Sequence, residues 1–219
     1  MSDQTDRLSR LRDTMRDQSI DLVAIAPGAH MAWLLDVRPH GDERPCIALI
    51  SRDKAAFLMP ALEADSAREQ TDMTFYNWAD SDGPDAALSA LLADFGAGSF
   101  KALVLDECMR ADHAALISDA LPGAARHFTA NTIGALRMRK EDGEYRTLKT
   151  NAQQADAAMK AAWAAIRPGM SELDVAQVAR ETFGGMGAQT LFTIVGAGRN
   201  GAFPHHHTGE TRLQAGDAV

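Results

Sequence analysis

Residues 141–169, EDGEYRTLKTNAQQADAAMKAAWAAIRPG, predict one long helix. This helix marks the start of a second domain. Apolar residues recur in the stretch at intervals of three and four, which places them on one face of a helix of about seven turns. They are Tyr145, Leu148, Ala152, Ala155, Met159, Ala162 and Ile166. Pro168 and Gly169 then end the helix. We expect a second domain to occupy residues 136–219, after a first domain at residues 1–135.

A second helix is expected directly after the first, since Ser171 and Asp174 have the spacing of a capping box. Its inward-facing residues are expected to be Val175, Val178, Ala179 and Phe183, before Gly184 and Gly185 end it. Residues 190–195, TLFTIV, are rich in β-branched and apolar side chains and predict a strand. Glu172, Asp174 and Glu181 are interpreted as capping or solvent-facing acids.

Residues 1–135 alternate between helical and strand patterns, which is typical of an α/β domain. Helices are expected around residues 8–15, 84–95 and 111–121, and strands at 21–25, 46–50, 55–59, 73–77 and 101–106. The runs at 46–50 and 55–59 are separated only by SRDK and predict an antiparallel hairpin. The predicted fold class is therefore α/β (α+β), with a mixed sheet in the first domain.

Composition excludes several classes of protein. The chain has 219 residues, of which 46% are hydrophobic and 24% charged, as in ordinary globular proteins. Its net charge of -8 argues against general affinity for nucleic acid or for an anionic membrane surface. No apolar run approaches the roughly 18 residues of a membrane helix, and the polar start lacks a signal-peptide pattern, so a cytoplasmic location is expected. Cys46 and Cys108 lie beside apolar runs, far apart in sequence, and are expected to be buried free thiols.

Three adjacent histidines, at 205–207, are the side chains best suited to chemistry. Pro204 fixes the backbone before His205, so a defined imidazole could be presented to a substrate. On an extended strand neighbouring side chains alternate, so only His205 and His207 could serve one site. A solvated histidine cluster without a role is the alternative that these residues leave open. No HExxH, CxxC or paired acidic motif lies nearby, so no metal ligands are assigned within the chain.

Residues 196–201, GAGRNG, have the GxGxxG spacing of a dinucleotide-binding loop and follow a predicted strand. That loop requires a helix to begin at its last glycine, where the helix N-terminus holds the phosphates. Pro204 and the three histidines follow here instead, so we do not expect a phosphate site.

Several motifs occur in a fixed order along the second half of the chain. They are residues 136–144 (LRMRKEDGE), the alanine-rich helix, residues 166–172 (IRPGMSE), and residues 202–205 (AFPH) followed by Leu213, Gly216 and Asp217. Together they resemble the creatinase, prolidase and aminopeptidase P family of pita-bread metallopeptidases. The resemblance implies that residues 1–135 form a creatinase-type N-terminal domain and residues 136–219 the truncated first half of a pita-bread peptidase domain.

The resemblance implies a fragment of a metal-dependent Xaa-Pro aminopeptidase or dipeptidase, which hydrolyses the peptide bond before proline. In that family a divalent metal pair (Mn, Zn, Co or Fe) is held by two Asp, one His and two Glu, all of which would follow Val219. The chain alone is thus expected to be inactive and metal-free. Its parent protein would be a homodimer that acts on a peptide or small amide substrate. His205 matches the family histidine beside the metals, as a catalytic and substrate-binding residue, and His207 is a second substrate-binding candidate.

Two alternatives stay open, since the family also contains creatinases, which hydrolyse a carbon–nitrogen bond without metal, and non-catalytic modules that bind peptides or proteins. A final strand ending at Val219 is expected to be incomplete, which would leave apolar faces of the second domain uncovered.

Overall fold

The computed structural model describes residues 3–219, with side chains from residue 6 onward. The chain folds as two compact units, Met1–Arg139 and Lys140–Val219. Each unit has its own apolar core. In the described residues, none of the helices is both long enough and apolar enough to span a membrane.

A six-stranded mixed sheet forms the centre of the first unit, with the order β4-β3-β2-β1-β5-β6. Its strands are β1 (Leu22–Ile25), β2 (Ile47–Ser51), β3 (Ala55–Pro60), β4 (Thr74–Trp78), β5 (Ala102–Leu105) and β6 (Ala125–Phe128). β2 is antiparallel to both of its neighbours, and every other pair is parallel. The predicted mixed sheet and its hairpin are confirmed, with Ala48 opposite Phe57.

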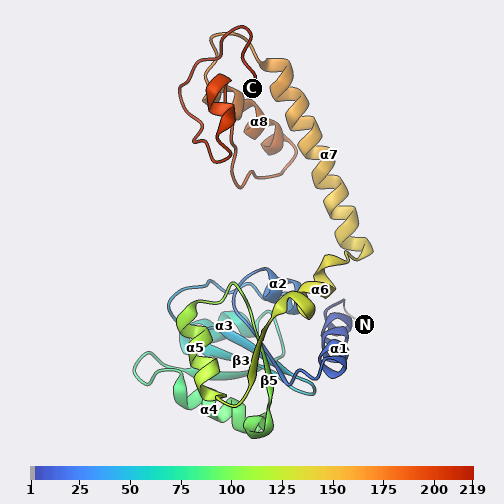
Figure 1. Cartoon of the computed structure of the whole chain (residues 1–219), viewed down its shortest axis with the longest axis vertical. Coiled ribbons are helices and arrows are strands. Elements are labelled where there is room, and N and C mark those ends of the chain that lie inside the picture. The colour runs from blue at the N-terminus through green and yellow to red at the C-terminus, as the bar shows by residue number, and fades with distance from the viewer. Residues whose placement is uncertain (1–2) are drawn as a thin grey trace. The chain divides into compact units, whose positions relative to one another are not determined.

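Helices cover both faces of this sheet (Figure 1). They are α1 (Asp3–Asp17), α2 (Ala29–Leu35), α3 (Ala61–Arg68), α4 (Asp85–Asp94), α5 (Ala111–Ala120) and α6 (Ile133–Met138), with short 3-10 turns η1 (Ala97–Ser99) and η2 (Thr129–Asn131). Successive strand side chains point to opposite faces, so the strands contribute to two separate cores. One contains Val23, Ile25, Ala48, Ile50 and Phe57 and packs against α1 and α2. The other contains Leu22, Ala24, Leu49 and Leu58 and packs against α4 and α5.

The two cysteines have different environments. Cys46 is buried beside β2, as expected, and burial raises the pKa of its thiol to about 12. The prediction for Cys108 is wrong, because this residue is exposed. Cys108 lies in the turn after β5, where its backbone N–H donates to Asp106 Oδ1 at 2.9 Å. It therefore belongs to a surface turn and not to the buried strand before it.

The second unit consists of α7 (Asp142–Ala165), α8 (Glu172–Gly185) and the 3-10 helix η3 (Gly198–Ala202), joined and followed by segments without regular secondary structure. Both α-helices begin with capping boxes, formed by Glu141 with Glu144 and by the predicted pair Ser171 and Asp174. The core of this unit is small and contains Ala162, Val175, Ala197 and Leu213.

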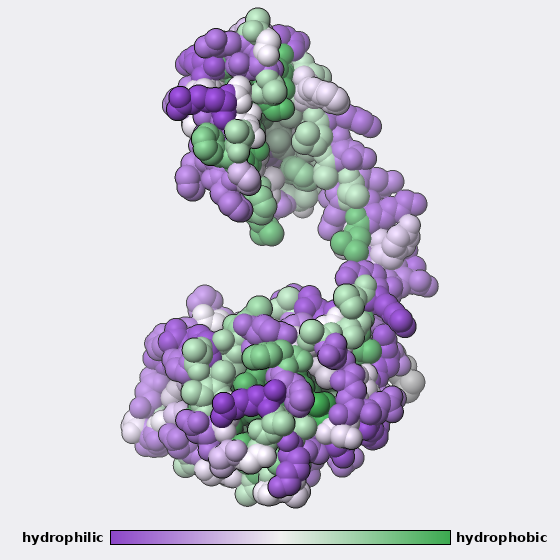
Figure 2. All heavy atoms as spheres, viewed as in Figure 1, coloured by the Kyte–Doolittle hydropathy of each residue, from purple (hydrophilic) through white to green (hydrophobic). Residues whose placement is uncertain are grey.

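The predicted apolar face of α7 is largely exposed, as expected from the prediction that apolar faces of the second domain are left uncovered. Tyr145, Leu148 and Met159 are 61%, 50% and 65% exposed, whereas Ala158 and Ala162 are buried. α8 packs against α7 at these small side chains, where Ala162 shares a core with Val175. Figure 2 shows the resulting hydrophobic surface on the second unit.

Residues 190–195 do not form the predicted strand. In the described part of the chain they have no strand partner, and a side chain satisfies their backbone instead. Val195 N–H donates to Thr208 Oγ1 at 2.8 Å, and Thr208 Oγ1 donates to the Thr193 carbonyl at 3.3 Å. A pattern of apolar and β-branched residues favours a strand, but a strand also needs a neighbouring chain segment with which to pair.

Candidate functional site

Glu172 is the central residue of the polar site in the second unit. It is the first helical residue of α8, directly after the N-cap Ser171. Its side chain is fully buried, with 0% of its surface exposed. A carboxylate is favoured at this end of a helix, because unpaired backbone N–H groups give the N-terminus a partial positive charge. The location explains why an acid is tolerated inside this small core.

Both oxygens of the Glu172 carboxylate are fully engaged. Oε1 accepts from the Ala197 backbone N–H at 2.9 Å and from Asn200 Nδ2 at 2.8 Å. Oε2 accepts from the Gly209 backbone N–H at 3.0 Å and from His206 Nε2 at 2.8 Å. An ionised carboxylate offers about four acceptor positions, so these four donors use its capacity.

The hydrogen bonds also fix the charge of this group. Burial alone raises the pKa of Glu172, but the bonds from Ala197, Asn200, His206 and Gly209 outweigh burial and bring its pKa to about 2. The carboxylate is therefore ionised at neutral pH and can only accept hydrogen bonds. It follows that His206 Nε2 carries the hydrogen in this contact.

The three histidines take different positions around this carboxylate. His206 is half-buried and contacts Glu172, whereas His205 and His207 are exposed. The segment is not the expected strand: Pro204 and His205 form a turn, closed by the His206 N–H donating to the Phe203 carbonyl at 3.1 Å. His206, which lies between two exposed histidines, is thus the one of the three that contacts the carboxylate.

The glycine-rich loop at 196–201 is shaped by close contacts. A Cβ on Gly196 would lie 3.0 Å from the Asn200 backbone, and one on Gly198 would lie 2.9 Å from Asp217 Oδ1. Gly198 also has a positive φ of 55°, which disfavours other residues. The Ala197 amide, which a phosphate would need, already donates to Glu172. The chain's own carboxylate therefore takes the place of an external anion.

Sequence reasoning missed the role of Glu172 and interpreted it as a capping or solvent-facing acid, which is wrong. The interpretation is confirmed for Asp174, which caps α8, and for Glu181, which is exposed and accepts from Gln177 Nε2 at 2.9 Å. The sequence contained a local signal for the position of Glu172 at a helix N-terminus, since this residue directly follows the predicted N-cap Ser171. Its donors, however, are 25 to 37 residues further along the chain.

A second polar cluster lies in the first unit, where the parallel strands β1, β5 and β6 end at one edge of the sheet. His30 follows β1, Asp106 and Glu107 follow β5, and Thr129 follows β6. Among the described residues, His30, Asp106 and Glu107 are the only set of three His, Cys, Asp or Glu side chains whose ligand atoms lie within 4.8 Å of one another.

Neither cluster fits the metal pair that the resemblance implies. Arg137 Nη1 lies 3.0 Å from His30 Nδ1, and Thr129 Oγ1 lies 3.1 Å from His30 Nε2 and also donates to Glu107. A guanidinium already occupies the cluster, and a divalent cation would be repelled by it. The Glu172 carboxylate has no acceptor position left. We therefore derive no reaction step through a metal from the residues of this chain.

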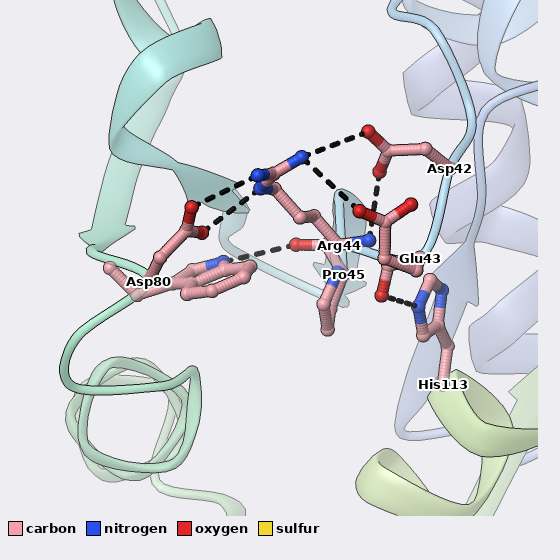
Figure 3. A network of polar contacts seen from close by, with 7 residues as sticks. Asp42, Glu43, Arg44, Pro45, Asp80 and His113 are labelled. Carbon is pink, nitrogen blue, oxygen red and sulfur yellow. Dashed lines mark hydrogen bonds and ion pairs between the residues drawn. The ribbon is translucent and has the colours of Figure 1, made fainter.

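A third polar network, around Arg44, is structural (Figure 3). Arg44 Nε and Nη2 donate to the two oxygens of Asp80 at 2.9 and 3.0 Å, and Nη1 donates to Asp42 and Glu43 at 3.4 Å. These hydrogen bonds hold the pKa of Asp80 below its usual value. Trp78 Nε1 donates to the Pro45 carbonyl at 3.1 Å. The network joins the loop before β2 to the end of β4.

Two known protein families together match almost the whole chain. Residues 7–139 match the creatinase/prolidase N-terminal domain, and residues 146–219 match metallopeptidase family M24. A curated relative, probable dipeptidase PepE of Mycobacterium tuberculosis, is 29% identical over 97% of this chain and 57% of its own length.

Solved structures of similar proteins extend this comparison. The dipeptidase PepE of Mycobacterium ulcerans has a TM-score of 0.84 and 26% identity, and covers 98% of this chain and 58% of its own. A prolidase from Thermococcus sibiricus has the same fold, with a TM-score of 0.84 at 21% identity, over 99% of this chain and 60% of its own. The chain thus spans less than two thirds of the length of the relatives that it matches.

Proposed function

The chain belongs to the creatinase/prolidase family of metallopeptidases, and on this premise we propose that it is part of a metal-dependent peptidase that acts on short peptides. We propose more specifically that the parent protein cleaves the bond before proline, as an Xaa-Pro dipeptidase or aminopeptidase. The observation that carries the proposal is the exposed turn at Pro204 and His205. The next residue, His206, is hydrogen-bonded to the buried and ionised carboxylate of Glu172.

His205 is the proposed catalytic and substrate-binding residue, and His207 a further substrate-binding residue. Both imidazoles are exposed, and neither has a hydrogen-bond partner among the described residues. An imidazole can donate a hydrogen bond or a proton near neutral pH, which suits a group that contacts the carbonyl of a substrate. The imide bond before proline has no N–H, so its recognition depends on ring shape and on neighbouring carbonyl groups.

The proposal assigns the metal ligands to residues outside this chain. A pair of divalent ions such as Mn, Zn, Co or Fe would supply a nucleophile and polarise the substrate carbonyl. The residues of this chain supply the histidine turn and the buried carboxylate beneath it. We accordingly propose that the 219-residue chain is inactive alone. Homodimeric assembly of the parent protein and a cytoplasmic location stay predictions.

The proposal is tested with the protein encoded by the whole gene and with the 219-residue chain, assayed in parallel. Both are incubated with Ala-Pro and Leu-Pro, and with Ala-Ala as a matched peptide, with and without Mn²⁺, Co²⁺ or Zn²⁺. We expect metal-dependent cleavage of the proline peptides by the longer protein only, and a fall of about 100-fold in kcat/KM for His205→Ala. Full activity of His205→Ala would contradict the proposed catalytic and substrate-binding role of His205.

The same assay separates the alternatives. Hydrolysis of creatine without metal would favour a creatinase-like enzyme. A longer protein that lacks the acidic ligands, and binds peptides without cleaving them, would favour a non-catalytic binding module.

A further inference from the structure

We propose that Glu172 is a positioning residue for His205, which acts through His206 and through loop amides on both sides of the Pro204 turn. This inference rests on the proposed function of His205. Glu172 does not itself touch the exposed face of the turn, because its carboxylate is fully buried.

One carboxylate bridges the two ends of the histidine turn. Ala197 and Asn200, which donate to Oε1, precede Pro204 in the chain. His206 and Gly209, which donate to Oε2, follow His205. The segment between Asn200 and His206 is thus closed at both ends on a single side chain. An ionised acceptor makes these bonds stronger than bonds between neutral groups.

The contact of His206 determines the direction of His205. Pro204 has a fixed φ, and the turn is closed by two backbone bonds of 3.1 Å, from Phe203 N–H to the Asn200 carbonyl and from His206 N–H to the Phe203 carbonyl. His205 and His206 are consecutive, so the backbone that places one ring also limits the position of the other. When the His206 ring is held inward on Glu172, the His205 ring is directed outward.

The carboxylate is itself held by a rigid element. Glu172 N–H donates to the Thr211 carbonyl at 3.1 Å, and Leu173 N–H donates to the Gly209 carbonyl at 3.2 Å. The capping box of Ser171 and Asp174 fixes the first turn of α8 around it. The histidine turn is therefore anchored to the first turn of a helix, and such anchoring holds a side chain in a productive orientation.

The matched variants are Glu172→Gln and Asp174→Asn. Each replaces one acid in the first turn of α8 by its amide, but only Glu172 contacts the histidine turn. A glutamine offers one acceptor oxygen and brings two donors against groups that also donate. His206→Leu removes the ring donor, and His206→Gln keeps a side-chain N–H as the conservative variant.

The readout is NMR of the 219-residue chain, with order parameters for residues 203–209 and ring signals for His205 and His207. We expect Glu172→Gln and His206→Leu to lower the order parameters of this turn from about 0.85 to below about 0.6 and to shift the His205 ring signals, while α8 stays unchanged. Asp174→Asn and His206→Gln should resemble the unsubstituted chain. An unchanged turn in His206→Leu would overturn the proposal, even if Glu172→Gln fails to fold.

Activity of the protein from the whole gene separates this inference from the proposed function. If His205→Ala keeps full activity, the proposed function of His205 fails, whatever the NMR result. If His205→Ala is inactive and His206→Leu loosens the turn without lowering kcat, positioning by Glu172 and His206 fails. We expect His206→Leu to lower kcat at least 10-fold with little change in KM, and His206→Gln to restore it.

Discussion

Arg137 Nη1 donates to His30 Nδ1 across 3.0 Å, at the edge of the sheet where β1, β5 and β6 end. A guanidinium has no acceptor, so this ring nitrogen carries no hydrogen and Nε2 carries it instead. Nε2 lies 3.1 Å from Thr129 Oγ1. Burial lowers the pKa of His30, and Arg137 lowers it further against the opposing effect of Asp106 and Glu107. A neutral imidazole thus joins α2 to α6.

This contact predicts that the first unit loses stability in mildly acidic solution. The unfolded His30 ring binds a proton near pH 6.5, whereas the folded ring resists protonation until the pH is lower. The unfolded state therefore binds more protons below pH 6.5, and stability falls as the pH is lowered through this range. Thermal melting between pH 7.5 and 5.5 should show a weaker pH dependence for His30→Gln. His127→Gln, at an exposed position of β6, should behave like the unsubstituted chain.

Removal of the Glu172 carboxylate should destabilise the second unit strongly. Glu172→Ala leaves four donors without their acceptor, and we expect a loss of about 3 kcal/mol in the free energy of unfolding. Hydrogen exchange of the α8 amides measures this loss separately from the first unit. Glu181→Ala is the control on the same helix and should change stability by less than about 0.5 kcal/mol. Equal effects of the two substitutions would contradict the structural role of Glu172.

Strong acid should destabilise the second unit by protonating the Glu172 carboxylate. The pKa of Glu172 is about 2 in the folded chain, below its ordinary value of 4.5. The stabilisation from its ionised form is thus present above pH 4.5 and is lost as the pH falls toward 2. We expect the α8 amides to exchange faster across this range in the unsubstituted chain. A smaller acceleration is expected in Glu172→Gln, whose side chain does not titrate.

The thiols should differ sharply in reactivity. Cys108 is exposed, whereas burial raises the pKa of Cys46 to about 12 and also blocks access to its sulfur. A thiol reagent such as DTNB should modify one cysteine rapidly in the native chain and both after denaturation. Cys108→Ser should abolish the rapid phase. Rapid modification of that variant would contradict the burial of Cys46.

The exposed apolar surface of the second unit should bind hydrophobic dyes. A cavity of about 390 Å³ is lined by α7, α8 and residues 193–196, and Trp163 at its edge is 77% exposed. Trp163→Lys should reduce dye fluorescence without destabilising the chain, because the side chain is already in water. Leu62→Lys, at a 78% exposed position of the first unit, is the matched control and should leave dye binding unchanged.

Elements whose cause is local were predictable from the sequence. The helix at 142–165 follows from apolar spacing, and the start of α8 follows from the capping pair Ser171 and Asp174. The hairpin of β2 and β3 follows from two apolar runs separated by four residues. In each case the interacting residues are neighbours along the chain, so their pattern contains the information.

Features that depend on distant partners were not predictable in this way. Residues 190–195 have the pattern of a strand, but no adjacent segment in the described structure pairs with them. Cys108 has apolar neighbours in sequence and is nevertheless exposed in a turn. For the histidines, sequence reasoning selected His205 and His207, whereas the structure brings His206 to the carboxylate.

The sequence by itself determined the family resemblance, the mixed sheet, the long helix at 142–165, the capped start of α8 and the three adjacent histidines as the candidate residues for chemistry. Only the tertiary structure decided that Glu172 is buried and ionised beneath that turn, and that Arg137 holds His30 neutral. The physical reason is that a charge becomes stable inside a protein only when its hydrogen-bond donors converge on it. For Glu172 those donors come from loop positions up to 37 residues away.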